Sequence, residues 1–377
     1  MDRPDPRAAP DTPPDAGDVT GTSGAHSPDE DRATRGGRRA RKRISLALQG
    51  GGSHGAFTWG VLDRLLEDGR FTVEGISGTS AGAVNGTVLA YGLREGGSEG
   101  ARTLLTELWT RIADRALLSP FQPTWWDRLT GNPNLDASPA YAIFDAMTRV
   151  VSPYQFNPLD FNPLRDILDA MLDMSVLQGP GDPKLYISAT DVTEGRLHVF
   201  RGDSLSIDAL MASTCLPFLF KAVEISGRYY WDGGYMGNPT LYPLVHECEA
   251  TDIVVVQINP IRRPDVPMTP TAIMDRINEI SFNSTFMREV RSMALINRLI
   301  DEGRLDGPAC GLRPAYIHMI GAEEEMDRLT ASSKLNADWG FVRDLFDLGR
   351  ETADGWIEET AGALGRRSTF DPGRFSI

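Results

Sequence analysis

Two glycine-rich turns, each placed between a short apolar run and a helical pattern, constrain the fold more than any other feature. The apolar run Ile44–Gln49 leads directly into Gly50–Gly55, and residues 56–69 then have the apolar spacing of a helix. The run Val73–Ile76 leads in the same way into Gly78–Gly82, and a helix of small residues is predicted from Ser80 to about Leu93. A strand, turn and helix repeated at these lengths predict a parallel sheet with crossover helices.

The rest of the body extends this pattern. Strands are predicted at 185–190, 197–200, 253–258 and 316–320, and long helices at 270–302 and 338–363. Repeated prolines and aromatic residues indicate an interrupted helical insertion at about 101–175. The predicted class is α/β, a three-layer α/β/α fold with a mainly parallel central sheet. We expect a core over 44–260 and a mainly helical C-terminal extension over 261–377.

Residues 1–43 differ from this body. They hold 9 basic and 8 acidic residues, six prolines and few large apolar side chains, so we expect a disordered tail. The chain as a whole carries a net charge of −14, which excludes a general nucleic-acid binder. The basic run Arg35–Arg43 is a candidate contact for an anionic membrane surface, and the alternative is a solvated tail.

The sequence shows no segment typical of a membrane-spanning, secreted or disulfide-stabilised protein. It has no apolar run of membrane-spanning length and no secretory leader, and its three cysteines are too scattered for a disulfide framework or a metal site. We therefore expect a cytoplasmic protein, with peripheral membrane contact as the only membrane association. The 4 lysines against 34 arginines indicate the coding bias of a GC-rich bacterial genome.

The first glycine turn can bind an anion. Successive main-chain N–H groups in such a loop can point at one phosphate or oxyanion, and the following helix N-terminus adds a positive partial charge. The loop also satisfies the dinucleotide-binding pattern GxGxxG, with Glu74 near the position of a ribose-binding acid. A nucleotide-binding oxidoreductase is therefore the distant alternative. The residues concerned are Gly50, Gly51, Gly52, Ser53, His54 and Gly55.

The second turn favours a different chemistry. Ser80 is the central residue of a GxSxG pattern between a strand and a helix, where a tight turn exposes a nucleophilic hydroxyl above the sheet. Two loops on adjacent parallel strands converge at one sheet edge, so one supplies the nucleophile and the other the N–H donors. The serine-hydrolase interpretation therefore ranks above the dinucleotide one. The elbow consists of Gly78, Thr79, Ala81 and Gly82 around Ser80.

The base that activates this serine is less evident from the residues alone. His246 and His318 follow Ser80 in the chain order of an α/β-hydrolase triad, but neither has a recognisable loop signature. Asp232, followed by Gly233 and Gly234, is compatible with a carboxylate base and equally with an ordinary Asp-Gly turn.

Taken together, the GxGxxG loop, the GTSAG elbow and the Asp-Gly-Gly element resemble the patatin-like phospholipases, in the same order over about Ile44–Asn259. The resemblance implies a patatin-like fold and a Ser–Asp dyad with Ser80 as nucleophile and Asp232 as base. It implies an oxyanion hole in the glycine loop, hydrolysis of lipid acyl esters through an acyl-enzyme, and no metal or cofactor. An esterase or depolymerase of non-phospholipid esters is the closest alternative, and a non-catalytic scaffold is disfavoured by the intact Ser80 and Asp232.

One position departs from the family pattern. Where the family's loop usually has Arg or Lys, this chain has His54, which is only partly charged near neutral pH. His54 therefore leaves open whether the substrate carries a phosphate group. Separately, the sequence does not indicate an oligomeric state.

Overall fold

The computed structural model describes residues 41–117, 119, 121–307 and 309–375. The predicted disordered tail lies outside the described residues as far as position 40. Residues 42 and 43 belong to the first strand, β1 (Lys42–Leu48), so the folded body begins two residues before the predicted Ile44. The apolar residues of β1 are buried from Ile44 onward.

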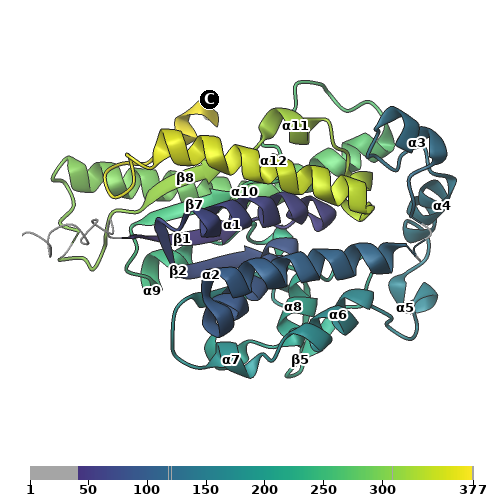
Figure 1. The fold of residues 1–377 in the computed structure, drawn as a ribbon, viewed down its shortest axis with the longest axis horizontal. Helices are drawn as coiled ribbons and strands as arrows, with labels where there is room; N and C mark the ends of the chain where they lie inside the picture. The colour runs from purple at the N-terminus through teal and green to yellow at the C-terminus, as the bar shows by residue number, and fades with distance from the viewer. Residues whose placement is uncertain (1–40, 118, 120, 308, 376–377) are drawn as a thin grey trace, which may run out of the picture. The chain divides into compact units, whose positions relative to one another are not determined.

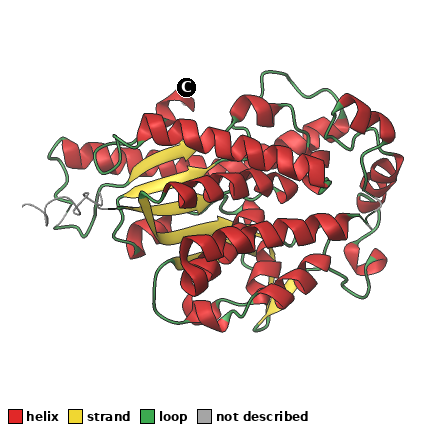
Figure 2. Cartoon of the chain, viewed as in Figure 1, coloured by secondary structure: helices red, strands yellow, loops and turns green. Residues whose placement is uncertain are grey.

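The described ranges contain one eight-stranded sheet in the order β5-β6-β3-β2-β1-β7-β8, with β4 paired to β3 (Figure 2). The remaining strands are β2 (Phe71–Thr79), β3 (Lys184–Asp191), β4 (Arg196–Phe200), β5 (Val223–Ile225), β6 (Arg228–Asp232), β7 (Asp252–Val256) and β8 (Tyr316–Ile320). Strands β3, β2, β1, β7 and β8 run parallel to one another, while β4, β5 and β6 form the antiparallel part. The mainly parallel sheet predicted from the two glycine turns is confirmed.

Helices cover both faces of this sheet. The helices are α1 (Gly55–Asp68), α2 (Ala81–Ala116), α3 (Trp125–Thr130), α4 (Pro139–Thr148), α5 (Pro153–Phe156), α6 (Pro163–Met171), α7 (Ser175–Gln178), α8 (Ile207–Ser213), α9 (Tyr242–Glu247), α10 (Pro270–Asp301), α11 (Glu323–Asp327) and α12 (Trp339–Thr360). In Figure 1, α1, α2 and α12 lie in front of the sheet and α10 lies behind it. A large apolar cluster fills the space under α1, α2 and α12, and a smaller one lies under α9 and α10. The three-layer α/β/α class is therefore confirmed.

Helix α2 differs from its prediction, which ended it near Leu93. The chain reverses at Gly97, where φ is 61°, so that α2 consists of two arms, and Gly92 packs directly on the backbone of Ala101. The second arm buries Leu105 and Leu108 in the core. The insertion of interrupted helices, predicted from about residue 101, therefore begins at α3. Residues 101–116 form the buried second arm of α2 instead.

The C-terminal helix α12 packs on α1 at backbone contact distance. A Cβ at Gly60 would lie 2.0 Å from the carbonyl oxygen of Phe346, and one at Gly349 would lie 2.1 Å from that of Phe57. Only glycine at both positions allows this close crossing. Of the helices the structure describes, none is long and apolar enough to cross a membrane.

Candidate active site

Ser80 lies on the sharp turn between β2 and α2. Its φ of 54° and ψ of −124° lie outside the common regions for a residue with a side chain, and such strain is maintained by the surrounding structure. The Ser80 N–H donates to the hydroxyl of Ser213, at the end of α8, over 2.9 Å. The side chain is half-buried at the N-terminus of α2.

The glycines of the elbow allow this turn to pack against the glycine loop. A Cβ at Gly82 would lie 2.2 Å from the carbonyl oxygen of Leu48, and one at Gly78 would lie 2.5 Å from that of Gly82. A Cβ at Gly50 would lie 2.6 Å from the Cβ of Ser80. The two turns are therefore in direct contact at the carboxyl ends of β1 and β2.

Asp232 lies next to Ser80, at the end of β6. It is 1 % exposed, and the Ser80 hydroxyl acts on its carboxyl in the direction that lowers the pKa. The Gly234 N–H donates to Oδ1 over 2.7 Å, and the hydroxyl of Thr190 donates to the Asp232 carbonyl over 2.8 Å. A Cβ at Gly233 would lie 2.2 Å from the Ser188 carbonyl oxygen, so the Asp-Gly-Gly turn needs its first glycine to pack on β3.

The environment of Asp232 gives its carboxyl an unusual pKa. Burial raises the pKa to about 6, while the Gly234 N–H, the Ser80 hydroxyl and the Lys334 ammonium act in the lowering direction. A carboxylate with a pKa near 6 is ionised at neutral pH, yet it is a stronger base than an ordinary aspartate. These are the properties that proton transfer from a serine hydroxyl requires.

The glycine loop presents main-chain donors beside this pair. The Gly50 N–H already donates to Asn238 Oδ1 over 2.6 Å, and the His54 N–H donates to the Gly51 carbonyl. Within the described part of the chain, the N–H groups of Gly51, Gly52 and Ser53 have no hydrogen-bond partner. Of the six loop residues named from the sequence, these three carry the N–H groups available to an oxyanion.

A network of side-chain amides holds the loop in place. Gln49 Oε1 accepts from the N–H groups of Ile258 and Asn259, and Gln49 Nε2 donates to Asn283 on α10. Asn259 Nδ2 donates to the Gly50 carbonyl over 2.7 Å. Sequence reasoning missed these amides as site residues, although the position of Asn259 just beyond a central parallel strand is a recognisable signal.

The two histidines considered as alternative bases lie elsewhere. His318 is fully buried in β8, where Nε2 bonds Asp252 and Nδ1 bonds Thr369, each at 3.0 Å. His246 is exposed near the end of α9, and its ring lies tilted against that of Tyr242. Neither histidine contacts Ser80, whereas the carboxyl of Asp232 lies beside it.

The acid of the dinucleotide interpretation is also engaged elsewhere. Glu74 is buried in the first half of β2, and its two carboxylate oxygens accept from the N–H groups of Glu249 and Ala250 at 2.6 and 2.7 Å. A carboxylate held in this way cannot bind a ribose at the glycine loop.

An elbow serine above a mainly parallel sheet places the chain in the nucleophile-elbow class of α/β proteins. Within that class, the chain belongs to the patatin-like phospholipase family, whose family model matches residues 46–245. The resemblance found in the glycine loop, the elbow and the Asp-Gly-Gly turn is thereby confirmed.

The individual proteins that the chain matches share only a small part of its sequence. Uncharacterised NTE family proteins of Mycobacterium bovis and Mycobacterium tuberculosis are 27% identical over 206 residues, which is 54% of this chain and 45% of each relative. The chain thus matches less than half the length of these curated relatives. Among solved structures, VipD from Legionella pneumophila has a TM-score of 0.34 at 17% identity, covering 82% of this chain and 67% of VipD. ExoU of Pseudomonas aeruginosa, in complex with SpcU, has a TM-score of 0.25 at 17% identity, covering 65% of this chain and 51% of ExoU.

Proposed function

We propose that the chain is a lipid acyl hydrolase that cleaves carboxylic esters through an acyl-enzyme on Ser80, with Asp232 as its base. The observation that carries the proposal is the buried Asp232 carboxyl, whose pKa is raised to about 6 and which the hydroxyl of Ser80, held at φ 54°, acts on. Membership of the patatin-like phospholipase family supports the substrate class.

The proposed reaction has two half-reactions. The Ser80 oxygen attacks the ester carbonyl carbon while Asp232 takes its proton, and the resulting oxyanion accepts from the N–H groups of Gly51, Gly52 and Ser53. The carbon–oxygen bond to the leaving alcohol then breaks, and the alcohol takes the proton from Asp232. In the second half, water attacks the acyl-enzyme with Asp232 again as base, releasing the fatty acid and restoring the Ser80 hydroxyl.

A panel of esters tests this function. Phospholipids, lysophospholipids, p-nitrophenyl esters and a storage polyester are incubated with wild type, Ser80→Ala and Asp232→Asn. We expect fatty acid release by wild type, in a phospholipase A-like or lysophospholipase-like pattern, and a loss of at least about a hundredfold in both variants. Polyester turnover alone would support the depolymerase alternative, and full activity of Ser80→Ala would reject the proposed nucleophile.

We also propose that the basic run Arg35–Arg43 brings the enzyme to anionic lipid. Of its last residues, Lys42 donates to the Ala361 carbonyl and Arg43 pairs with Glu249 at 3.0 Å. The exposed Arg41 and positions 35–40, which lie outside the described residues, would therefore carry the contact. Deletion of residues 1–40 should reduce flotation with phosphatidylglycerol vesicles and leave turnover of a dispersed short-chain ester unchanged. Unchanged flotation after the deletion would reject this contact.

A further inference from the structure

The histidine of the glycine loop does not supply a positive charge. His54 is 2% exposed, its Nε2 bonds the Ser333 hydroxyl at 2.8 Å, and its Nδ1 has no hydrogen-bond partner among the described residues. Burial, followed by the charges of Lys334 and Arg263, lowers the pKa of His54 well below its ordinary value. The imidazole is therefore neutral at physiological pH.

A lysine from the C-terminal extension lies over the same loop. Lys334 belongs to the 3₁₀ turn η5 (Ala331–Leu335), and a Cβ at Gly52 would lie 2.4 Å from its carbonyl oxygen and 3.2 Å from its Cβ. The Lys334 ammonium donates to Asn259 Oδ1 over 2.9 Å, and the amide Nδ2 of Asn259 donates in turn to the Gly50 carbonyl. Because an ammonium can only donate, it fixes which end of the Asn259 amide faces the loop.

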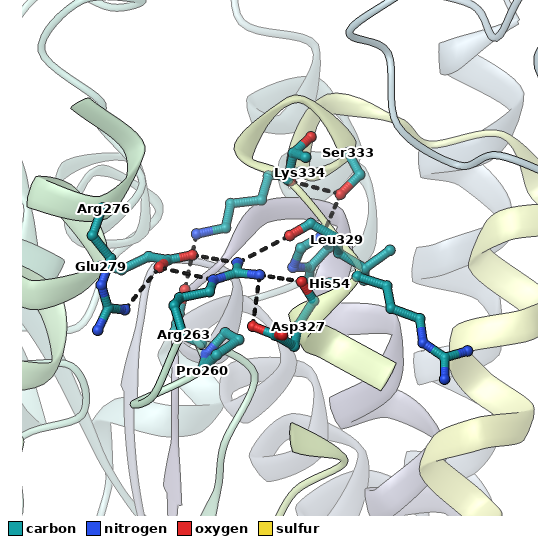
Figure 3. Close-up of polar contacts among 12 residues, drawn as sticks. His54, Pro260, Arg263, Arg276, Glu279, Asp327, Leu329, Ser333 and Lys334 are labelled. Atoms are coloured by element: carbon teal, nitrogen blue, oxygen red, sulfur yellow. Dashed lines mark hydrogen bonds and ion pairs between the residues drawn. The ribbon is translucent and has the colours of Figure 1, made fainter. Parts of the chain in front are cut away.

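The Lys334 ammonium forms no close ion pair with a carboxylate of the described residues. Its bond among the described residues is to the neutral amide of Asn259. The nearby carboxylate of Glu279 on α10 is paired with Arg263 at 2.6 Å and with Arg276 at 3.1 Å, as Figure 3 shows. Burial and the charge of Arg263 lower the pKa of Lys334, while the charges of Glu279, Asp275 and Asp232 oppose this.

We propose that Lys334 is the fixed positive charge of this active site and a positioning residue for its glycine loop. The proposal rests on the Ser80–Asp232 function proposed above. During acylation, negative charge moves from Asp232 to the oxyanion beside Gly51 and Gly52. Lys334 lies over Gly52, and its charge acts on the Asp232 carboxyl, so this charge stabilises the ionised base before the step and the oxyanion after it.

The other groups that face Asp232 do not supply this charge. The side chains of Cys215 and Tyr235 lie near it, and burial raises the pKa of each to about 12, so both are neutral at working pH. Around Lys334 the facing charged or titratable groups are His54 of the loop, Asp275 and Glu279 of α10, and Arg263. Its replacement therefore removes a cation whose charge lowers the pKa of the Asp232 carboxyl.

The test compares Lys334→Met, Lys334→Gln and Lys334→Arg with wild type in the full chain. The Gln variant keeps a donor for Asn259 without a charge, and it serves in place of Met if that variant does not fold. Lys184→Met is the matched control, because Lys184 also donates to a carbonyl, that of Glu247, but at the opposite end of the sheet. The readouts are the pH profile of kcat/KM on a p-nitrophenyl ester and the rate at which a fluorophosphonate labels Ser80.

We expect Lys334→Met and Lys334→Gln to lower kcat/KM and the labelling rate about tenfold or more. They should also move the acid limb at least about half a pH unit upward, since loss of a positive charge raises the pKa of Asp232. The Arg variant should keep the wild-type limb, and Lys184→Met should match wild type. A wild-type profile and rate in the Gln or Met variant would overturn the proposal while leaving the dyad intact. An inert, unlabelled wild type would instead reject the proposed function itself, and this proposal with it.

Discussion

At the scale of single residues, the proposed pairing of Ser80 with Asp232 would make a histidine base unnecessary. A serine hydroxyl needs a base that is ionised at neutral pH and still holds a proton firmly enough to take it. Burial raises the Asp232 pKa to about 6, and the N–H of Gly234 keeps the ionised form solvated inside the protein.

Activity should therefore fall in acid. Protonation of Asp232 removes the base, so kcat/KM for a soluble ester is expected to drop below about pH 6 with a slope of one proton. A pH profile in constant ionic strength checks this. A limb near the ordinary aspartate value of 3.8 would contradict the assignment of Asp232 as a buried base.

The same carboxyl should cost stability. Its folded pKa of about 6 exceeds the ordinary 3.8, so its stabilising contribution is full below about pH 4 and is lost as the pH rises through 6. Asp232→Asn cannot ionise, and at pH 8 it should be more stable than wild type by on the order of 3 kcal/mol. Urea unfolding at pH 8 and pH 4 measures this, and the two proteins should converge at pH 4. A less stable Asn variant at pH 8 would contradict the argument.

At the scale of elements, the elbow depends on backbone contacts that only glycine allows. A Cβ at Gly82 would lie 2.2 Å from the Leu48 carbonyl oxygen, whereas one at Gly96, in the same helix, would meet nothing within 4 Å. The glycine loop and the elbow are thus joined by backbone packing as well as by hydrogen bonds.

Gly82→Ala should consequently abolish ester turnover and destabilise the fold by about 2 kcal/mol or more, because β1 and α2 must move apart. Gly96→Ala, its matched control, should retain activity and be equally or slightly more stable. Thermal unfolding measures the stability of both variants, and an ester assay measures their turnover. Full activity in Gly82→Ala would show that the elbow is not packed in this way.

Much of the element scale was predictable from the sequence. The strand at 316–320 and the helices near 56–69, 270–302 and 338–363 were found from apolar spacing, because each buries a regular face. The reversal of α2 at Gly97 was not predictable, since a glycine inside a helical pattern also occurs without a turn. Lys334 and Asn259 were missed as site residues because their roles depend on contacts between segments 75 residues apart.

At the scale of the whole molecule, the part of the chain beyond the family match completes the core. Strand β8 pairs with β7, and α12 packs on α1 through the glycine pair Gly60 and Gly349. The turn η5 then lies over the glycine loop through Lys334 and Ser333.

A chain that ends at residue 260 should accordingly fail to fold. It would expose the apolar face of α1 and leave β7 as an uncovered edge strand, which favours aggregation. A chain of residues 41–377 should fold and keep ester turnover. Size-exclusion chromatography and far-UV circular dichroism compare the two. A monomeric, active 41–260 fragment would contradict the view that the extension belongs to the core.

The central claim is that Ser80 is the nucleophile and that Asp232 activates it. The most direct measurement is peptide mass spectrometry of the full chain after reaction with a fluorophosphonate, for wild type, Ser80→Ala and Asp232→Asn at pH 7.5. We predict one phosphonylated peptide containing Ser80, none in Ser80→Ala, and labelling slowed by at least about a hundredfold in Asp232→Asn. Labelling of another residue, or ester turnover that survives Ser80→Ala in the folded protein, would contradict the account.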